Sequence, residues 1–315
     1  MTDEIIKYKQ NLVNSRKLYF LVTPIKNEET NLPNIIATVE RQSIQPFLWI
    51  IVNDCSIDNS AQIIKQFKER LPWIYDINLL ETREYLGINY ARVCKIGFDF
   101  GIKYCEKHKI DYKYIGLLDA DIILPQNYYS SLISEFDKNG KLGIASGGLI
   151  IKNNETVKHI SVFGDLPSGA TRLWSKKCFL ESGGYLLVHS PDSVSNIKAK
   201  LRGYDTKRFE YLEALHTREI SGAQGLWKGH YKDGEGAYYL NQNPLLVFLN
   251  GVKRFFSLRG YTSLAYILGY SASIVKRSEK IEDEEIKNYY FKVRLGELGI
   301  IYSNKIKNLF HSKDG

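Results

Sequence analysis

The sequence has few of the residues that hold small secreted domains together. Its four cysteines, Cys55, Cys94, Cys105 and Cys178, form no Cys-x-x-Cys pair, and no histidine pair has zinc-site spacing. A disulfide framework or a structural zinc site is therefore not expected, and scattered thiols are typical of a reducing compartment. The N-terminus also lacks the basic flank and apolar stretch of a secretory signal. These absences predict a cytoplasmic protein.

Long apolar runs are missing as well. No window reaches the roughly 20 apolar residues that a membrane-spanning helix requires. The nearest stretch, residues 260–275, is short, polar in places and flanked by Arg259 and Lys276. This pattern is more typical of a helix that lies at a membrane surface.

The composition is that of a folded basic protein. Apolar residues make up 44% of the chain, which is enough for a sizeable core, and the formal net charge is +8. A basic protein suits polyanionic partners such as nucleic acid, anionic lipid surfaces or phosphorylated small molecules. No helix-turn-helix, RNA-recognition or zinc-finger signature is present, so nucleic acid is not expected as a partner.

Apolar runs alternate with helical patterns over the first half of the chain. Strands are predicted at residues 18–23, 48–53, 77–80 and 112–118. Apolar residues at helical spacing predict helices at residues 31–42, 61–70, 90–107 and 126–136. Successive strand-then-helix units favour a Rossmann-like α/β fold, with a mostly parallel sheet flanked by helices. Ligands of such sheets bind at the carboxyl ends of the strands.

The pattern changes along the second half. After residue 140 come an apolar run and glycine-bearing loops, which are predicted to complete the sheet and form the second wall of a cleft. From residue 243 onward the chain has basic and aromatic helical stretches such as VKRFFSLRGY. We therefore expect an α/β domain over residues 1–240 and a helical extension over residues 241–315. Three roles are considered for this extension: docking on an anionic membrane surface, packing on the core, or forming a homo-oligomer.

Two acids follow the fourth predicted strand. Asp119 and Asp121 come directly after the apolar run that ends at Leu118. A divalent ion that bridges to a diphosphate needs oxygen ligands of this kind. Because a lone Asp-x-Asp arises by chance in a chain of this length, its position after a buried strand is what favours a metal and phosphate site.

Polar loops also follow the first two strands. TPIKNEE follows the first and VNDCSIDNS the second, so both place acids and amides at the same sheet edge. Asp58 and Asn59 are explained as caps of the next helix, whereas Asp54, nearer the strand end, is predicted to contact a ligand. In GINYARVCKIG, Gly87 precedes a helix whose first turns carry Arg92, an arrangement suited to a diphosphate. A solvated helix arginine is the alternative.

The ordered set TPIKNEE, VNDCSID, GINYARVCKIG and LLDAD resembles the inverting family-2 type of glycosyltransferase with the GT-A fold. The resemblance implies a metal-dependent enzyme that uses Mn or Mg and moves a sugar from a nucleotide-diphosphate sugar to a glycan or lipid-linked acceptor. It implies that the donor nucleotide contacts Pro24, Asn27, Glu28, Asp54, Arg92, Asp119 and Ala120. It implies that the metal ligands are Asp119, Asp121 and His216.

The chain departs from the family pattern at two positions of the donor motifs. The family often has two acids where this chain has Asn53 and Asp54, and often has Asn where this chain has Val93. Neither change removes a charge that metal binding requires. The choice of base and sugar stays open.

The acceptor side is assigned to the second half. ATRLWSKKCFLESGGY is similar to the family segment that lines the acceptor pocket, so Trp174, Gly183 and Gly184 are predicted to bind acceptor. Trp174 can stack on a sugar or prenyl carrier, although a buried core tryptophan is the alternative. The two glycines alternatively form a turn.

Asp192, before a predicted helix, is the predicted catalytic base, because a carboxylate can take the proton of the acceptor hydroxyl. A helix cap is the alternative explanation for Asp192. The imidazole of His216 is a suitable partner for Asp121 at a metal, and a surface histidine is the alternative.

Two rival functions are considered. A sugar-phosphate nucleotidyltransferase would have a glycine- and lysine-rich loop after the first strand, where this chain has TPIKNEE. A non-catalytic nucleotide or glycan binder would keep Asp54 and Arg92 but tolerate the loss of Asp192.

Overall fold

The computed structural model describes residues 18–81, 88–153, 156–159, 166–217, 225–257 and 260–299. The chain forms two compact units, Met1–Glu219 and Ile220–Gly315. The boundary expected after residue 240 falls just after helix α8 (Gly225–Tyr239), which belongs to the second unit. Each unit is described by itself.

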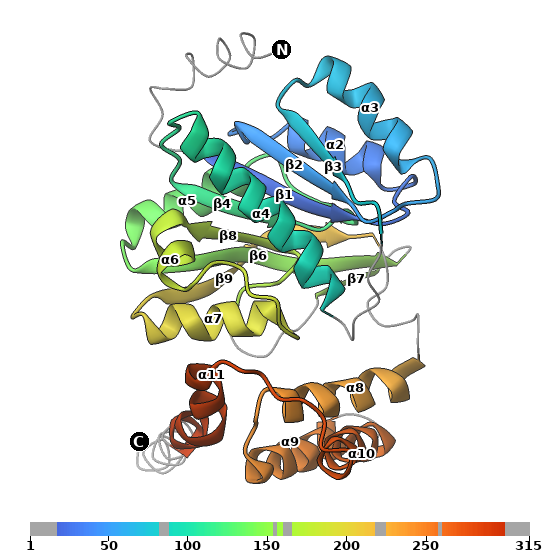
Figure 1. The fold of residues 1–315 in the computed structure, drawn as a ribbon, viewed down its shortest axis with the longest axis vertical. Coiled ribbons are helices and arrows are strands. Elements are labelled where there is room, and N and C mark those ends of the chain that lie inside the picture. The colour runs from blue at the N-terminus through green and yellow to red at the C-terminus, as the bar shows by residue number, and fades with distance from the viewer. Residues whose placement is uncertain are drawn as a thin grey trace. The chain divides into compact units, whose positions relative to one another are not determined.

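The first unit is a sheet with helices on both faces (Figure 1). Its strands are β1 (Tyr19–Ile25), β2 (Leu48–Asn53), β3 (Ile74–Asn78), β4 (Tyr114–Leu118), β5 (Ile122–Ile123), β6 (Leu142–Asn153), β7 (Thr156–His159), β8 (Thr171–Ser175) and β9 (Asp205–His216). Its helices are α2 (Leu32–Glu40), α3 (Ser60–Arg70), α4 (Asn89–Lys107), α5 (Tyr128–Lys138), α6 (Lys176–Glu181) and α7 (Pro191–Leu201). The predicted α/β class and its strand-then-helix order are confirmed.

The strand order is β3-β2-β1-β4-β8-β6-β9-β5, with β7 paired to β6. Strands β3, β2, β1 and β4 are parallel, whereas β8 joins β4 and β6 in antiparallel pairs. The loops after β1, β2 and β4 therefore meet at one edge of the sheet. The third strand lies earlier than expected, because Ile74 pairs with Trp49, while Leu80 is 100% exposed beyond the strand end.

The two faces of β1 are both buried, which explains its continuous apolar sequence. Tyr19 and Leu21 join the apolar layer beneath α2, α3 and α5, and Phe20 and Val22 join the layer beneath α4, α6 and α7. Helix α4 lies close to the sheet at Gly97, where a Cβ atom would be 2.5 Å from Val22 Cγ1. Polar side chains therefore begin where the strands end.

The second unit is helical. It contains α8, α9 (Pro244–Ser257), α10 (Gly260–Val275), α11 (Glu284–Asn288) and a π-helical turn at Tyr289–Val293. Helices α8 and α10 touch at two glycines: a Cβ atom on Gly234 would be 2.0 Å from Tyr266 O, and one on Gly269 would be 2.0 Å from Tyr231 O. None of the helices in the described ranges is both long enough and apolar enough to cross a membrane.

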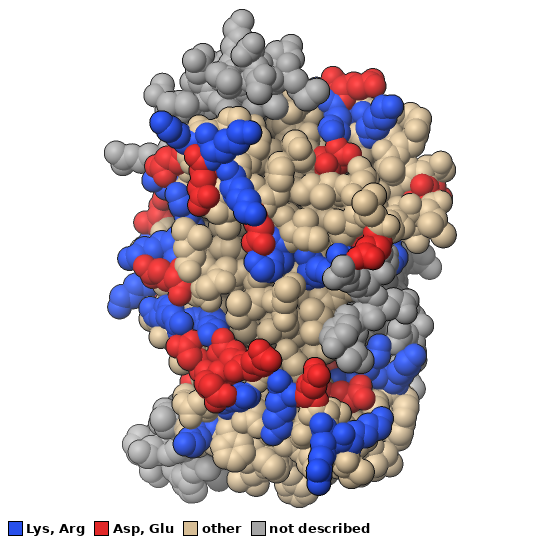
Figure 2. Space-filling model, viewed as in Figure 1, with Lys and Arg blue, Asp and Glu red and all other residues tan. Residues whose placement is uncertain are grey.

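Charged side chains of both signs are mixed over the face of the molecule shown in Figure 2. Charged side chains of the first unit form ion pairs, such as Lys95 with Asp99 at 2.9 Å and Lys113 with Asp111 at 2.7 Å. Exposed pairs of this kind contribute little to stability. The positive net charge is not gathered into a single basic patch on this face.

Candidate active site

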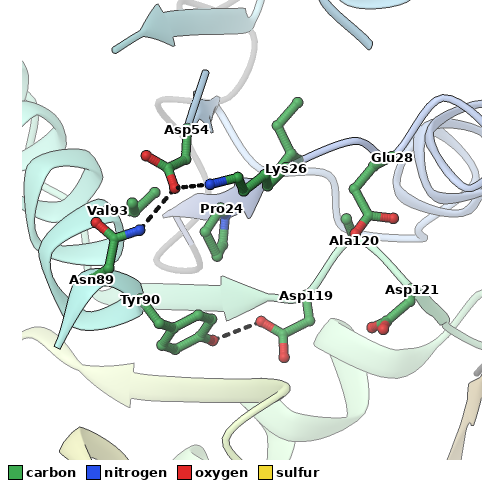
Figure 3. A pocket seen from close by; sticks show the side chains of 11 residues that line it. Pro24, Lys26, Glu28, Asp54, Asn89, Tyr90, Val93, Asp119, Ala120 and Asp121 are labelled. Atoms are coloured by element: carbon green, nitrogen blue, oxygen red, sulfur yellow. Dashed lines mark hydrogen bonds and ion pairs between the residues drawn. The ribbon is translucent and has the colours of Figure 1, made fainter. Parts of the chain in front are cut away.

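A pocket lies at the sheet edge where β1, β2 and β4 end (Figure 3). Its volume of about 380 Å³ falls in the range of small-molecule sites. The lining residues come from the end of β1, from the loops after these three strands and from the start of α4. They are Pro24, Ile25, Lys26, Glu28, Asp54, Asn89, Tyr90, Val93, Asp119, Ala120 and Asp121. The structure thus brings together most of the residues predicted for the donor and the metal.

Asp54 is a buried carboxylate held by polar partners on several sides (Figure 3). Its Oδ2 accepts a hydrogen bond from Asn89 Nδ2 at 2.8 Å and lies 3.5 Å from Lys26 Nζ. Arg92 Nη2 lies 3.6 Å from Asp54 Oδ1. These partners neutralise the carboxylate and fix its position in the pocket wall.

Arg92 stands behind this wall and is not among the lining residues. Its Nε donates to Asn89 Oδ1 at 3.2 Å, and its Nη2 donates to Glu81 O at 3.1 Å. These contacts fix the guanidinium beside Asp54 and Asn89, and its contact with a diphosphate stays a prediction. Gly87, the expected turn before α4, lies outside the described residues.

Asn27 joins two loops and does not line the pocket. Its backbone N–H donates to Ser56 Oγ, and its Oδ1 accepts from the Ile57 N–H, both at 2.9 Å. Its φ of 57° is left-handed, a conformation that asparagine tolerates. Asn27 thereby ties the loop after β1 to the loop after β2.

Glu28 does line the pocket and is buried. Its backbone N–H donates to Ser60 Oγ at 2.8 Å, and its Oε2 accepts from Asn31 Nδ2 at 2.8 Å. The start of α3 thereby fixes the Glu28 backbone, and the residue that caps α2 orients the carboxylate.

Asp119 is bound to the side chain of Tyr90 across the pocket (Figure 3). The Tyr90 hydroxyl donates to Asp119 Oδ1 at 2.6 Å, and the Asp119 backbone N–H donates to Ala170 O at 2.9 Å. The hydrogen bond leaves Asp119 Oδ2 to other partners. Tyr90 is therefore part of the site.

The electrostatic environment of Asp119 is unfavourable to its charge. Burial raises the pKa of Asp119 to about 7; the Tyr90 hydrogen bond lowers it, and the negative charges of Asp121 and Asp192 raise it. A bound divalent cation would favour the ionised carboxylate. The crowding of carboxylates is therefore compatible with a metal site.

Asp121 and His216 are neighbours, as predicted. Because β5 pairs with β9, Ile122 lies opposite His216, and His216 Nε2 is 3.8 Å from Asp121 Oδ2. The Thr217 backbone N–H donates to Asp121 O at 2.9 Å. Within the described part of the chain, no three Asp, Glu, His or Cys side chains form a ready-made metal cluster.

Of the three expected acceptor residues, Trp174 needs correction. Trp174 is only 2% exposed and packs against Phe98 and Phe179 in the core, so its ring is not available to stack on a sugar. Gly183 and Gly184 have φ values of 87° and 75° and end helix α6, which accounts for both glycines. Their contact with an acceptor stays a prediction.

Asp192 lies in the first turn of α7, and the helix cap is Ser190, so the alternative of a capping aspartate is wrong. Its side chain is 33% exposed. Its Oδ1 accepts from the Tyr185 hydroxyl at 3.3 Å and lies 3.7 Å from Arg172 Nε. The negative charge of Asp192 also raises the pKa of Asp119, so the two carboxylates are close enough to interact electrostatically, although Asp192 does not line the pocket.

Several site residues were not predicted. Lys26, Asn89 and Tyr90 line the pocket, while Tyr185 and Arg172 hold Asp192. The first three lie inside motifs that the sequence displays. A motif does not show which of its side chains point into the cavity, whether it lies in a loop, as Lys26 does, or in a helix, as Asn89 and Tyr90 do. Arg172 carried no signal, since an arginine in a short apolar run is read as exposed.

The fold of the first unit is the GT-A fold of glycosyltransferases. A crystal structure of Staphylococcus aureus TarS residues 1–349 with UDP-GlcNAc matches at a TM-score of 0.50 and 12% identity, over 70% of this chain and 65% of that one. A mannosyltransferase of Pyrobaculum calidifontis, solved with GDP-Man and Mn²⁺, matches at 0.50 and 10% identity, over 88% and 83%. At such identities the likeness concerns the fold alone.

The family follows from the sequence match. The model for glycosyl transferase family 2 matches residues 20–189, and the chain belongs to this family. Poly-beta-1,6-N-acetyl-D-glucosamine synthases are similar: one of Staphylococcus aureus at 27% identity over 67% of this chain and 51% of the relative, and one of Staphylococcus epidermidis at 30% over 67% and 52%. The chain spans about half the length of these relatives. The matched range contains every pocket residue but ends before Asp192 and His216.

Proposed function

We propose that this protein is a metal-dependent inverting glycosyltransferase that transfers a sugar from a nucleotide-diphosphate sugar to a hydroxyl of a glycan or lipid-linked acceptor. The observation that carries this proposal is the convergence of Asp54, Asp119 and Asp121 in one pocket within the family-matched range. Pockets at the carboxyl edge of a parallel sheet are the usual ligand sites of such folds.

The donor nucleotide is proposed to occupy this pocket, with its base and ribose near Asp54 and Glu28. Both carboxylates are held in place by protein partners, so they can accept hydrogen bonds from a ligand without reorganising. The titles of two structural neighbours name UDP-GlcNAc and GDP-Man as bound donors, which supports the class of donor.

Asp119, Asp121 and His216 are proposed to hold a divalent ion, Mn²⁺ or Mg²⁺. Carboxylate oxygens and an imidazole suit these ions, and the carboxylates lie in the pocket that would receive the diphosphate. Bound there, the ion would supply positive charge that stabilises the leaving diphosphate. The mannosyltransferase structure was solved with Mn²⁺, which supports a divalent ion as the cofactor.

Asp192 is proposed to act as the base. Its carboxylate takes the proton of the acceptor hydroxyl while that oxygen forms a bond to the anomeric carbon. The bond from this carbon to the diphosphate breaks, and its electron pair leaves with the diphosphate. Attack from the side opposite the leaving group inverts the anomeric configuration.

Diphosphate release tests the function. The protein is incubated with UDP-GlcNAc, other UDP-sugars and GDP-mannose, with Mn²⁺ or Mg²⁺, and with N-acetylglucosamine oligosaccharides, mannose oligosaccharides or prenyl-linked sugars. We expect acceptor-dependent release of nucleoside diphosphate that a chelator abolishes. Failure to bind any nucleotide sugar would contradict the proposal, and release unaffected by Asp192→Asn would favour a non-catalytic or different role for Asp192.

An anionic membrane surface is proposed as a partner of the second unit, which would bring the enzyme to a lipid-linked acceptor. The outward side of α9 is apolar and exposed: Leu245, Phe248, Leu249, Val252, Phe255 and Phe256. Arg254 points inward, with Nη1 2.9 Å from Asp233 Oδ2, whereas Lys253 is exposed. Residues 244–275 contain basic but no acidic side chains, so an anionic lipid surface is electrostatically more favourable than a second copy.

Vesicle sedimentation distinguishes binding to a lipid surface from binding to a second copy of the chain. We expect the protein to sediment with vesicles rich in phosphatidylglycerol more than with pure phosphatidylcholine, and Phe248→Glu with Phe256→Glu to abolish binding. The matched variant Val157→Glu changes an exposed apolar residue of β7 and should have no effect. A concentration-dependent dimer that the double variant dissociates, without vesicle binding, would instead identify α9 as a contact between copies.

A further inference from the structure

A fully buried arginine lies beneath the predicted base. Arg172 belongs to β8, between β4 and β6, and its side chain is 0% exposed. A buried guanidinium is unfavourable unless hydrogen bonds and an opposite charge compensate it. The groups that bind the guanidinium therefore indicate the structural role of Arg172.

The Arg172 guanidinium is held on several sides. Its Nε donates to Ser168 O at 3.0 Å, and its Nη2 donates to Pro167 O at 3.0 Å. Its Nη1 donates to Asp192 O at 3.2 Å and lies 3.5 Å from Asn196 Oδ1. Arg172 thus joins the loop before β8 to the first turn of α7.

The opposite charge is supplied by Asp192, whose Oδ1 lies 3.7 Å from Arg172 Nε. The same oxygen accepts a hydrogen bond from the Tyr185 hydroxyl at 3.3 Å. On the other side Gly169 leaves room, because a Cβ atom there would be 1.9 Å from Asp192 Oδ2. The carboxylate is therefore held by one buried cation, one phenol and a backbone without a side chain.

We propose that Arg172 is a positioning residue for the transfer reaction: from beneath, it fixes the Asp192 carboxylate, together with Tyr185, in the orientation that takes the acceptor proton. This proposal rests on the proposed function and deepens it. Arg172 does not touch substrate. Its guanidinium lies beside the carboxylate, and its two bonds to the loop and one to the Asp192 carbonyl fix the distance between α7 and β8.

Kinetics of Arg172→Lys and Arg172→Gln test the proposal, with the donor and acceptor pair that the wild type turns over. We expect kcat to fall roughly tenfold in the lysine variant and about a hundredfold in the glutamine variant, in the range of general-base contributions. The donor KM, and the affinity for UDP with Mn²⁺, should change less than about twofold. Lysine rescues part of the rate because it keeps the charge but not the fork of donors.

A double-mutant cycle with Asp192→Asn separates positioning from general stability. In the Asp192→Asn background, Arg172→Lys should cause no further loss of kcat, because the group that it positions has already been disabled. A full additional loss in that background would overturn the proposal. So would an unchanged kcat in Arg172→Lys, or a loss confined to the donor KM.

Arg208 supplies a matched control. It is another buried arginine of the sheet, on β9; its Nη1 donates to Leu166 O at 3.3 Å, in the same loop, but it pairs with Glu210 instead of Asp192. Arg208→Lys should lower the thermal midpoint without reducing kcat. An equal fall of kcat in both lysine variants would show that loop support alone is responsible, which overturns the proposal. A wild type that binds donor but transfers no sugar would overturn the proposed function itself.

Discussion

The candidate site has a proposed base side, formed by Asp192, and a proposed metal side, formed by Asp119 and Asp121. The carboxylates of the two sides have different electrostatic surroundings. On the proposed base side, Asp192 lies 3.7 Å from a buried cation, Arg172, whose charge also lowers the pKa of Asp119. On the metal side, Asp119 and Asp121 lie close enough for their charges to repel, and burial raises the pKa of Asp119 to about 7. A carboxylate with a built-in cation is ready to act alone, whereas carboxylates that repel one another gain most from an added divalent ion.

The largest effect is expected from Asp121→Asn, which removes a charge from the metal side. Because metal and diphosphate binding are both proposed to depend on this side, transfer should fall roughly a thousandfold and the response to Mn²⁺ should disappear. Diphosphate release over a Mn²⁺ titration measures both. Asp99→Asn, which changes a partly exposed acid of α4, is the matched control and should keep full activity.

Asp192→Asn should have the next largest effect and should be confined to the base side. We expect kcat for transfer to fall by on the order of a hundredfold or more, while the donor KM changes little. Steady-state kinetics with varied donor and varied acceptor measure the two quantities. A donor KM that rises as much as kcat falls would mean that Asp192 belongs to the donor pocket.

Asp54→Asn is expected to weaken donor binding about tenfold, the scale of one hydrogen bond to a charged group. It leaves Lys26 and Arg92 without their shared carboxylate, so part of the loss comes from those cations. Calorimetric titration with UDP measures the affinity. Unchanged affinity would remove Asp54 from the proposed nucleotide site.

Tyr90→Phe should have the smallest effect, a loss of a few fold in kcat/KM, since it removes one hydrogen bond to Asp119 and keeps the ring. Because Tyr90 orients a proposed metal ligand, the loss should be smaller at saturating Mn²⁺ than at limiting Mn²⁺. An identical loss at both concentrations would place Tyr90 outside the metal side.

The loops that form the pocket can be predicted from the sequence, whereas the surroundings of Asp192 can be predicted only in part. Strands β1, β2 and β4 are buried on both faces, so their apolar runs and the polar loops after them are unmistakable. The acids at Asp54, Asp119 and Asp121 follow those strands directly, which is why the pocket could be predicted.

The structure of the second half of the first unit is harder to predict from the sequence, for physical reasons. Strand β5 spans only Ile122–Ile123, and β8 mixes Arg172 and Trp174 with apolar residues, so neither has a clear period. Whether Trp174 faces a substrate or the core depends on long-range packing against Phe98. The pairing of Arg172 with Asp192 likewise joins residues that only the folded chain brings together.

The most direct test of the contrast between the two sides is the affinity for UDP measured with and without Mn²⁺ in the wild type, Asp121→Asn and Asp192→Asn. We predict that Mn²⁺ strengthens binding in the wild type and in Asp192→Asn to the same extent, and has no effect in Asp121→Asn. Equal loss of the Mn²⁺ response in both variants, or its retention in Asp121→Asn, would contradict the division of roles between Asp121 and Asp192.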